Sequence, residues 1–312
     1  MNVKHSVSTR ASDSSPEPPD DAVLARIRSL LTTLRPSEQR VARVFLDDVQ
    51  TAATLPIGEV ARMADTSTTT VVRFYRSFGF TQYKDFRIAI VREAYREQLV
   101  AADLPDVGED VGRDDAPADI IAKIAVAETH SIADTAEVLD PEQLSGAIAA
   151  LRTARRVDVF GLSASAVVAL DLQQKLTRIG RTALTWTDAH QAWTAAATLD
   201  DSCVAIGVSH SGVTPEVLHF LTVAAAGGAR TLAITNAAGS PLAEQADFVL
   251  ATSARESGFR SGALGSRIAQ LMVVDCLFIG LAQATYEEST AAVRATYRAV
   301  HGARDARRPE AL

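Results

Sequence analysis

Two hydrophobic patterns divide the chain. Between residues 21 and 101, apolar side chains recur every three to four positions, which is the spacing of amphipathic helices. The pattern predicts an all-helical domain with helices over residues 23–34, 37–49, 57–64, 67–78 and 83–100. Ser37 and Ser67 are the expected N-caps of the second and fourth helices, and Gly79 the glycine that ends the fourth.

Beyond residue 150, short apolar runs alternate with longer amphipathic stretches. Such alternation is typical of a doubly wound parallel sheet flanked by helices, so the second fold class is α/β. Two helices, over residues 120–138 and 141–151, precede the first strand. The five expected strands are Arg156–Phe160, Thr182–Trp186, Cys203–Val208, Arg230–Thr235 and Phe248–Ala251.

Composition shifts mark the boundaries between these units. Residues 1–20 are polar and rich in Ser, Pro and Asp, and predict a disordered tail. Residues 102–119, rich in Asp, Gly and Pro, predict a linker between a helical domain (21–101) and a sheet domain (120–287). Residues 288–312 are expected to form a C-terminal helix and tail.

The charge distribution is compatible with one DNA-binding module on an acidic protein. The 312 residues carry a net charge of −7. Residues 22–98 nevertheless hold 12 Arg and Lys against 8 Asp and Glu, a net +4 that leaves about −11 for the rest.

Other features point to the cytoplasm and away from metals and membranes. Cys203 and Cys276 lie in apolar runs and predict reduced, buried thiols, as in a reducing cytoplasm. We expect no metal site and no cofactor, because the spacing of metal ligands is missing. The apolar run Leu271–Ala282 is interrupted by Asp275 and is too short to cross a bilayer, so no membrane association is expected.

A candidate anion site follows the third expected strand. Ser209-His-Ser-Gly-Val-Thr214 is a hydroxyl-rich turn between an apolar run and a helix start at Pro215. The N–H groups of such a turn, together with the positive end of the helix dipole, favour a phosphate. An ordinary capped turn of a parallel sheet explains the turn equally well on its own.

A second turn of similar composition follows the first expected strand. Gly161-Leu-Ser-Ala-Ser165 again places small and hydroxyl residues where a strand passes into a helix. Because two such turns converge on one crevice beyond the strand ends, the pair favours a site for a phosphorylated polyol.

Residues 57–78 have the pattern of a helix-turn-helix. Val60, Ala61 and Ala64 are expected to pack against the second helix, whose Thr69, Arg73 and Arg76 then share an exposed face. In a helix-turn-helix the second helix enters the major groove, where Thr and Arg contact bases or phosphates. A purely structural helical pair remains the alternative on periodicity alone. The predicted DNA-binding residues are Ser67, Thr68, Thr69, Thr70, Arg73 and Arg76.

The motifs in both halves resemble those of one family. The run Ser209-x-Ser211-Gly212-x-Thr214 is similar to the phosphate loop of the SIS (sugar isomerase) domain, a phosphosugar-binding fold. The family's first loop usually reads Gly-x-Gly-x-Ser, and here Ser163 stands at the second glycine. Val71-Val-Arg-Phe74, Gly79-Phe80 and Tyr83-Lys-Asp-Phe86 resemble the helix-turn-helix domain of RpiR-type (MurR/RpiR) transcriptional regulators.

This resemblance implies a DNA-binding transcriptional regulator of carbohydrate metabolism with a sugar phosphate effector. Its expected partners are double-stranded operator DNA, the effector and further copies of itself, as a homodimer or homotetramer. The resemblance assigns the effector phosphate to Ser163, Ser165, Ser209, Ser211, Gly212 and Thr214. Further possible effector contacts are His190, Glu256 and Arg260.

Two alternatives differ in kind from a regulator. One is a phosphosugar isomerase or lyase, which needs a general base and an acid beside the sugar. His190, Glu216 and Glu256 are the candidates, and they do not form a convincing acid–base pair in the sequence, so no catalytic residue is predicted. The other is a phosphosugar-binding protein that acts only through protein partners.

Overall fold

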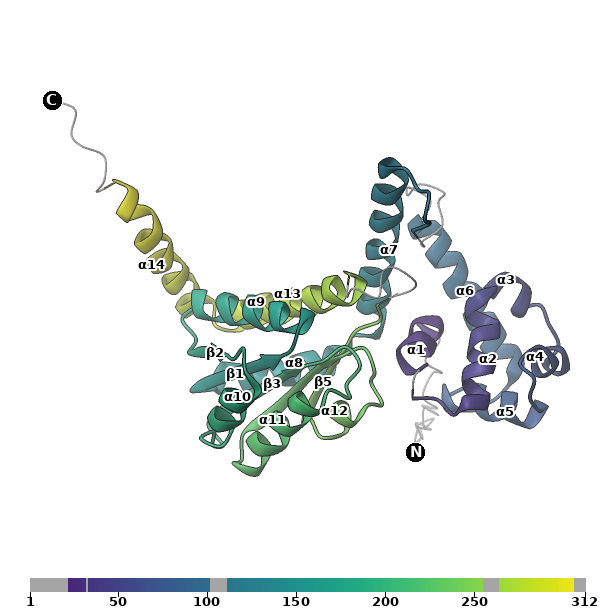
Figure 1. Ribbon diagram of the computed structural model, residues 1–312, viewed down its shortest axis with the longest axis horizontal. Helices are drawn as coiled ribbons and strands as arrows, with labels where there is room; N and C mark the ends of the chain where they lie inside the picture. Colours follow the sequence, from purple (N-terminus) through teal and green to yellow (C-terminus); the bar gives the residue numbers. More distant parts are fainter. Residues whose placement is uncertain (1–21, 32, 102–110, 255–263, 306–312) are drawn as a thin grey trace, which may run out of the picture.

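The computed structural model describes residues 22–31, 33–101, 111–254 and 264–305. Two domains lie end to end, and α14 projects from the end of the sheet domain that lies away from the helical domain (Figure 1). The expected N-terminal tail lies outside the described residues, as do residues 102–110 of the expected linker. The rest of that linker is described, and α7 begins within it, at Pro117.

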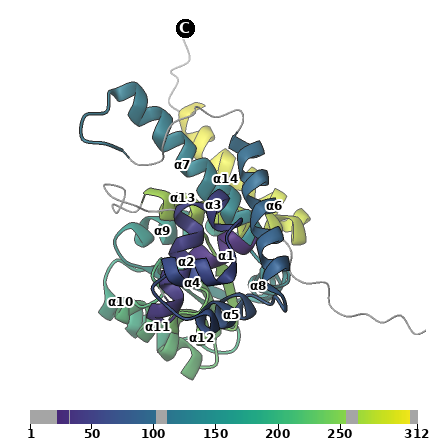
Figure 2. The same cartoon turned by 90° about the vertical axis from the view of Figure 1, so that its right-hand side faces the viewer.

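The helical domain is formed by the N-terminal helices. The amphipathic stretches over 23–34 and 37–49 form α1 and α2, although α1 ends earlier, at Leu30. The prediction that Ser37 is an N-cap is wrong, because Pro36 occupies the first position of α2 and Arg35 precedes it as the N-cap. A short helix, α3, was not predicted. The domain comprises α1 (Val23–Leu30), α2 (Pro36–Asp47), α3 (Val49–Ala52), α4 (Ile57–Met63), α5 (Thr68–Ser77) and α6 (Tyr83–Ala101); Figure 2 views it from its outer side.

Aromatic rings hold the helical core together. The buried Phe86 ring of α6 makes edge contacts with Phe45 of α2 at 5.2 Å and Phe74 of α5 at 5.9 Å. The Tyr83 hydroxyl donates to the Leu55 carbonyl at 3.1 Å, and burial raises the pKa of Tyr83 to about 12, so it remains a donor at neutral pH. The Tyr-x-x-Phe pattern therefore serves to pack α6 against α2 and α5.

The sheet domain has five parallel strands in the order β2-β1-β3-β4-β5. Three strands, β3 (Cys203–Val208), β4 (Arg230–Thr235) and β5 (Phe248–Ala251), match the predicted ranges, while β1 (Arg156–Gly161) and β2 (Ala183–Thr185) differ by one or two residues. The predicted fold is confirmed.

Helices cover both faces of this sheet (Figure 1). One apolar core includes residues of α8, α9 and α13, and the other includes residues of α10, α11 and α12. Alternate β3 residues serve the two cores, with Val204, Ile206 and Val208 on one face and Cys203 and Ala205 on the other. The helices are α7 (Pro117–Val138), α8 (Pro141–Thr153), α9 (Ala164–Arg178), α10 (Ala189–Ala196), α11 (Pro215–Ala226), α12 (Pro241–Glu244), α13 (Leu264–Ala284) and α14 (Tyr286–Asp305).

The helix α13 is longer than the predicted Leu271–Ala282 segment. At 21 residues it is the one helix in the described ranges that is long and apolar enough to cross a membrane. In this fold it packs against α7, α8 and α9, with eight of its residues buried. Asp275, which interrupts the apolar run, lies on the exposed side of the helix, 2.8 Å from Lys175 of α9.

Candidate functional sites

The strand order places a topological switch point between β1 and β3. Gly161 at the end of β1 pairs with Val208 at the end of β3, so the loops that follow these strands begin side by side. In open α/β sheets, ligands bind beyond the carboxyl ends of the strands at such a point. The two turns singled out in the sequence are these two loops.

The loop from Ser209 to Thr214, hereafter the phosphate loop, is held in shape by its own hydroxyls. The buried Ser209 Oγ accepts from the Gly212 N–H at 3.2 Å and lies 2.8 Å from Thr214 Oγ1. Ser211, in contrast, is exposed. Ser209 and Thr214 therefore shape the loop from inside, whereas the exposed Ser211 Oγ accepts only a long bond from the Val213 N–H, at 3.4 Å. Thr214 occupies the N-cap position of α11, but its side chain bonds to Ser209 and does not cap the helix.

Gly212 is required by both its backbone and its surroundings. Its φ of +65° is a conformation that L side chains rarely adopt. A Cβ at this position would lie 1.9 Å from Ser240 Oγ, so any side chain would displace the neighbouring loop.

The loop after β1 contains a backbone turn that normally uses glycine. Ser163 has φ +55° and ψ −123°, and the Ser165 N–H donates to the Leu162 carbonyl at 3.1 Å. These are the features of a type II′ turn with Ser163 at its first central position, where glycine is favoured. Ser163 is exposed and Ser165, in the first turn of α9, is half-buried.

A third loop contacts the phosphate loop and was not predicted as part of the site. The Asn236 N–H donates to the His210 carbonyl at 3.0 Å, and the Leu242 N–H donates to the Gly212 carbonyl at 3.1 Å. The sequence does contain a feature that could have indicated this loop: Thr235 and Asn236 are polar residues at the carboxyl end of a buried strand.

The other possible effector contacts are less well placed. His190 is exposed in the first turn of α10, with its ring against Trp193 at 5.1 Å. Glu256 and Arg260 lie outside the described residues.

Residues in α4 and α5 form the expected helix pair. Val60, Ala61 and Ala64 share one buried cluster with Val71 and Phe74. Ser67 accepts from the Thr70 N–H as the N-cap of α5. Gly79 has φ +92°, and the Phe80 N–H donates to the Tyr75 carbonyl, which ends the helix as a Schellman motif.

The predicted DNA-binding residues divide into two groups in the structure. Thr68, Thr69, Arg73 and Arg76 are exposed along α5. Ser67 is also exposed, but Thr70 is buried and its hydroxyl lies 3.2 Å from Ser67 Oγ. Thr70 thus belongs to the cap of the helix, and its side chain does not lie on the exposed face.

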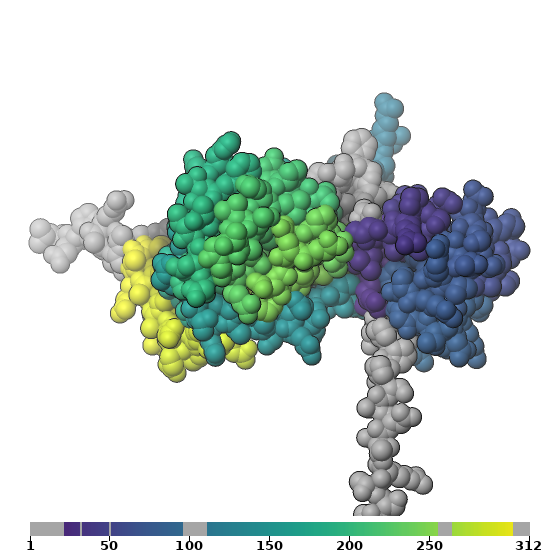
Figure 3. Space-filling view, turned by 90° about the horizontal axis from the view of Figure 1, so that it is seen from below, coloured from purple at the N-terminus to yellow at the C-terminus, as the bar shows by residue number. Residues whose placement is uncertain are grey.

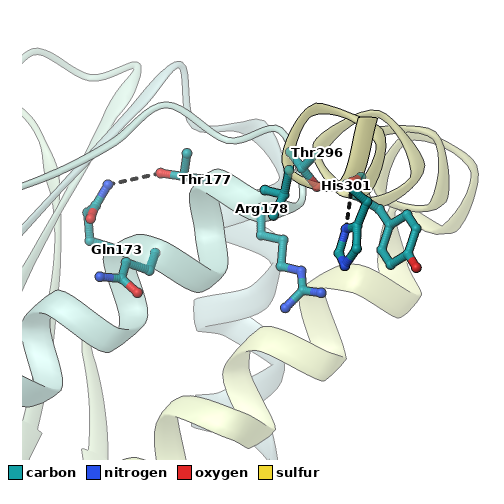
Figure 4. Close-up of a pocket in the computed structure, with 8 residues that line it drawn as sticks. Gln173, Thr177, Arg178, Thr296 and His301 are labelled. Atoms are coloured by element: carbon teal, nitrogen blue, oxygen red, sulfur yellow. Dashed lines mark hydrogen bonds between the residues drawn. The ribbon is translucent and has the colours of Figure 1, made fainter. Parts of the chain in front are cut away.

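One groove lies away from the loops at the switch point. Its volume is about 440 Å³, and it is bounded by the C-terminal half of α9 and by α14 (Figure 4). Because α9 starts beside the phosphate loop and runs back along the sheet, Thr177 and Arg178 lie at the opposite end of the helix. No group of three His, Cys, Asp or Glu side chains able to hold a metal occurs in the described residues.

Comparisons with known proteins decide the family. The model of the RpiR-family helix-turn-helix domain matches residues 21–97, and the SIS domain model matches residues 150–280. An uncharacterized HTH-type transcriptional regulator of Caldanaerobacter subterraneus is 37% identical over 266 residues, or 85% of this chain and 92% of that protein. The chain belongs to the RpiR family of transcriptional regulators.

Other relatives of this RpiR regulator agree with that assignment. The regulator YbbH of Bacillus subtilis is 30% identical over 90% of this chain and 98% of its own length. The structure of Vibrio vulnificus NanR in complex with ManNAc-6P is 28% identical, with a TM-score of 0.56 over 89% of this chain and 98% of NanR. The bifunctional protein glk of Burkholderia orbicola is 34% identical over 84% of this chain, which spans only 40% of glk.

Proposed function

We propose that this regulator binds operator DNA through α5 and that a sugar phosphate in the crevice between β1 and β3 changes its affinity for that DNA. The observation that carries the proposal is the phosphate loop, which lies at the switch point of the sheet with its exposed Ser211 beside the start of α11. We also propose that the regulator acts in the cytoplasm, on operator DNA.

The phosphate is assigned to the loop and to the helix end behind it. Ser211 and the loop N–H groups donate to the phosphate oxygens, and the positive end of the α11 dipole adds to the attraction. Ser165 of the neighbouring turn completes the pocket. The NanR structure is a complex with ManNAc-6P, which supports a sugar phosphate as the ligand class here.

The DNA-binding surface is assigned to the exposed face of α5. Thr68 and Thr69 at its start contact base edges, while Arg73 and Arg76 contact guanine or phosphate. A homodimer presents two such helices to a pseudo-palindromic operator, since two-fold symmetric proteins bind two-fold symmetric sites. The SIS domain supplies the contacts between copies.

We infer further that the chain regulates and does not catalyse. The relatives that it matches along most of their length are named as regulators. An isomerase assay on the sugar phosphates that bind tests this point. Isomerase activity that remains in the purified protein would contradict it.

The experiment that tests the proposal is a thermal-shift screen of the full chain against sugar phosphates, including ManNAc-6P. A ligand at about 100 times its Kd adds roughly 2.7 kcal/mol of stability, a shift of several degrees. We expect the shift to be lost in Ser211→Ala. A ligand that binds without changing operator affinity in a subsequent anisotropy titration would overturn the regulatory part, because binding must couple the two sites reciprocally.

A further inference from the structure

We propose that the loop between β4 and α12, residues 236–240, transmits the state of the phosphate loop to α1 and from there to the recognition helix α5. This inference rests on the proposed function, because the signal is the arrival of a phosphate. The connection runs between the phosphate loop and α5, which belong to different domains.

At one end, the β4–α12 loop is fixed to the phosphate loop. Asn236 N–H and Leu242 N–H donate to carbonyls of His210 and Gly212. Thr235 Oγ1 also donates to the His210 carbonyl, at 3.3 Å. Since Ser240 fills the space beside Gly212, a shift of the phosphate loop displaces the β4–α12 loop.

The side chain of Asn236 extends this connection to the end of β5. Its Oδ1 accepts from the Ala254 N–H at 2.6 Å and from Thr252 Oγ1 at 3.1 Å. Between these two donors lies Ser253, which is fully buried. One acceptor atom therefore positions the backbone on both sides of Ser253.

Ser253 joins the sheet domain to the DNA-binding domain. Its hydroxyl donates to the Ala25 carbonyl in α1 at 3.2 Å, and its N–H donates to Thr135 Oγ1 of α7 at 3.1 Å. The first of these bonds connects residues 228 positions apart in the sequence. Figures 1 and 3 show α1 between the sheet domain and the rest of the helical domain.

The β4–α12 loop also lies close to the same helix at a second place. A Cβ on Gly239 would lie 3.5 Å from Thr33 Oγ1 and 3.6 Å from the Leu30 side chain, which is van der Waals distance. The β4–α12 loop thus has the phosphate loop on one side and the end of α1 on the other.

Buried polar contacts fix α1 within the DNA-binding domain. The Leu24 and Ala25 N–H groups donate to the two carboxylate oxygens of Glu93 in α6, at 2.6 and 2.9 Å. Arg26 donates to the carbonyl of Phe78, the residue that ends α5, at 3.4 Å. A displacement of α1 is therefore passed to α6 and to the C-terminal end of the recognition helix.

The connection is tested without knowing the ligand, by hydrogen exchange of the full chain. Gly212→Ala forces Ser240 to move, whereas Gly180→Ala places the same methyl at a comparable positive φ, 3.2 Å from Ala292 and beside α14. We expect amide exchange in residues 24–31 to rise in Gly212→Ala and to stay at the wild-type rate in Gly180→Ala. Equal behaviour of the two variants would overturn the inference.

Two milder pairs keep the test decisive if Gly212→Ala does not fold. Asn236→Asp retains the oxygen that accepts from Ala254 and Thr252, and Asn236→Leu removes it. Ser253→Ala removes the bond to Ala25, and Ser289→Ala removes a buried hydroxyl that bonds only within the region of α14, to Thr285. We expect exchange in α1 to rise about fivefold in Asn236→Leu and Ser253→Ala, the factor that corresponds to roughly 1 kcal/mol for one hydrogen bond.

The outcomes separate this inference from the proposed function. If a sugar phosphate stabilises the protein but Asn236→Leu and Ser253→Ala exchange like the wild type, the transmission route is wrong and the effector site stands. If the variants loosen α1 as expected but no sugar phosphate binds, the route is supported and the ligand class is wrong.

Discussion

Arg28 and Asp134 form an ion pair that joins the two domains. The Arg28 guanidinium of α1 donates to the Asp134 carboxylate of α7 at 2.8 Å, and the Asp134 side chain is only 3% exposed. Removing one partner of a buried pair leaves a charge without full compensation, which costs about 3 kcal/mol or more. We therefore expect Arg28→Ala to destabilise the protein by about 3 kcal/mol in urea unfolding.

The exposed pair Arg62–Glu59 provides the matched control. Its side chains are 73% and 46% exposed, so water screens the attraction. We expect Arg62→Ala to change the free energy of unfolding by less than about 1 kcal/mol. Similar losses in the two variants would show that the interdomain pair contributes no more than a surface pair.

Ser163 offers a stabilising substitution in the loop after β1. A residue other than glycine at φ +55° carries backbone strain of about 1 kcal/mol or more. We expect Ser163→Gly to raise the free energy of unfolding by about 1 kcal/mol. Ser165→Gly, in the first turn of α9, is expected to lower it by roughly 0.5 kcal/mol, because glycine has poor helix propensity. A destabilised Ser163→Gly variant would show that the serine side chain supplies a compensating contact.

The sequence predicted the parts of the fold that depend on local pattern. The runs Cys203–Val208 and Arg230–Thr235 have sharp ends, because polar residues flank the first and Gly228-Ala229 and Asn236 flank the second. The short helix α3 was missed because its four residues contain no apolar repeat. Asp275 interrupts an apolar run in the sequence and lies on the exposed side of α13, but its ion pair with Lys175 could not be read from that run, because the two residues lie on different helices.

The sequence motifs predict where the candidate sites lie. They do not predict which of the motif side chains are buried and which are exposed. Ser209 and Ser211 look equivalent in the sequence, yet one is buried in the loop and the other faces solvent. Thr70 shares the hydroxyl-rich helix start with Thr68 and Thr69 but is buried against the cap. Asn236 acts through contacts with residues distant in the sequence, which no local pattern reveals.

The role of the exposed arginines of α5 in DNA binding can be tested without knowing the operator sequence. Phosphate contacts supply most non-specific DNA binding, and each contact contributes about 0.9 to the slope of log K against log salt concentration. We expect Arg73→Ala and Arg76→Ala each to weaken binding to a random duplex and to reduce this slope by up to about 1 if the residue contacts a phosphate. Fluorescence anisotropy across a salt series measures both quantities.

Arg178→Ala is the control for these two variants. It removes the same exposed charge from α9, in the sheet domain. We expect it to leave affinity and slope at wild-type values. Loss of binding in Arg178→Ala as large as in Arg73→Ala would mean that overall charge, and not the face of α5, attracts the DNA.

Alanine substitutions at the two serines of the phosphate loop are expected to have different effects on stability and on ligand binding. Ser209→Ala removes a buried hydroxyl that accepts from Gly212 and bonds to Thr214, so it lowers the free energy of unfolding by about 1–3 kcal/mol. It also weakens sugar phosphate binding, because the loop loses its shape. Ser211→Ala removes an exposed hydroxyl and is expected to weaken ligand binding alone, with unfolding within about 0.5 kcal/mol of the wild type. Urea unfolding without ligand, followed by calorimetric titration of a sugar phosphate, separates the two effects. If Ser211→Ala were the less stable variant and Ser209→Ala bound normally, the roles assigned to the two hydroxyls would be reversed.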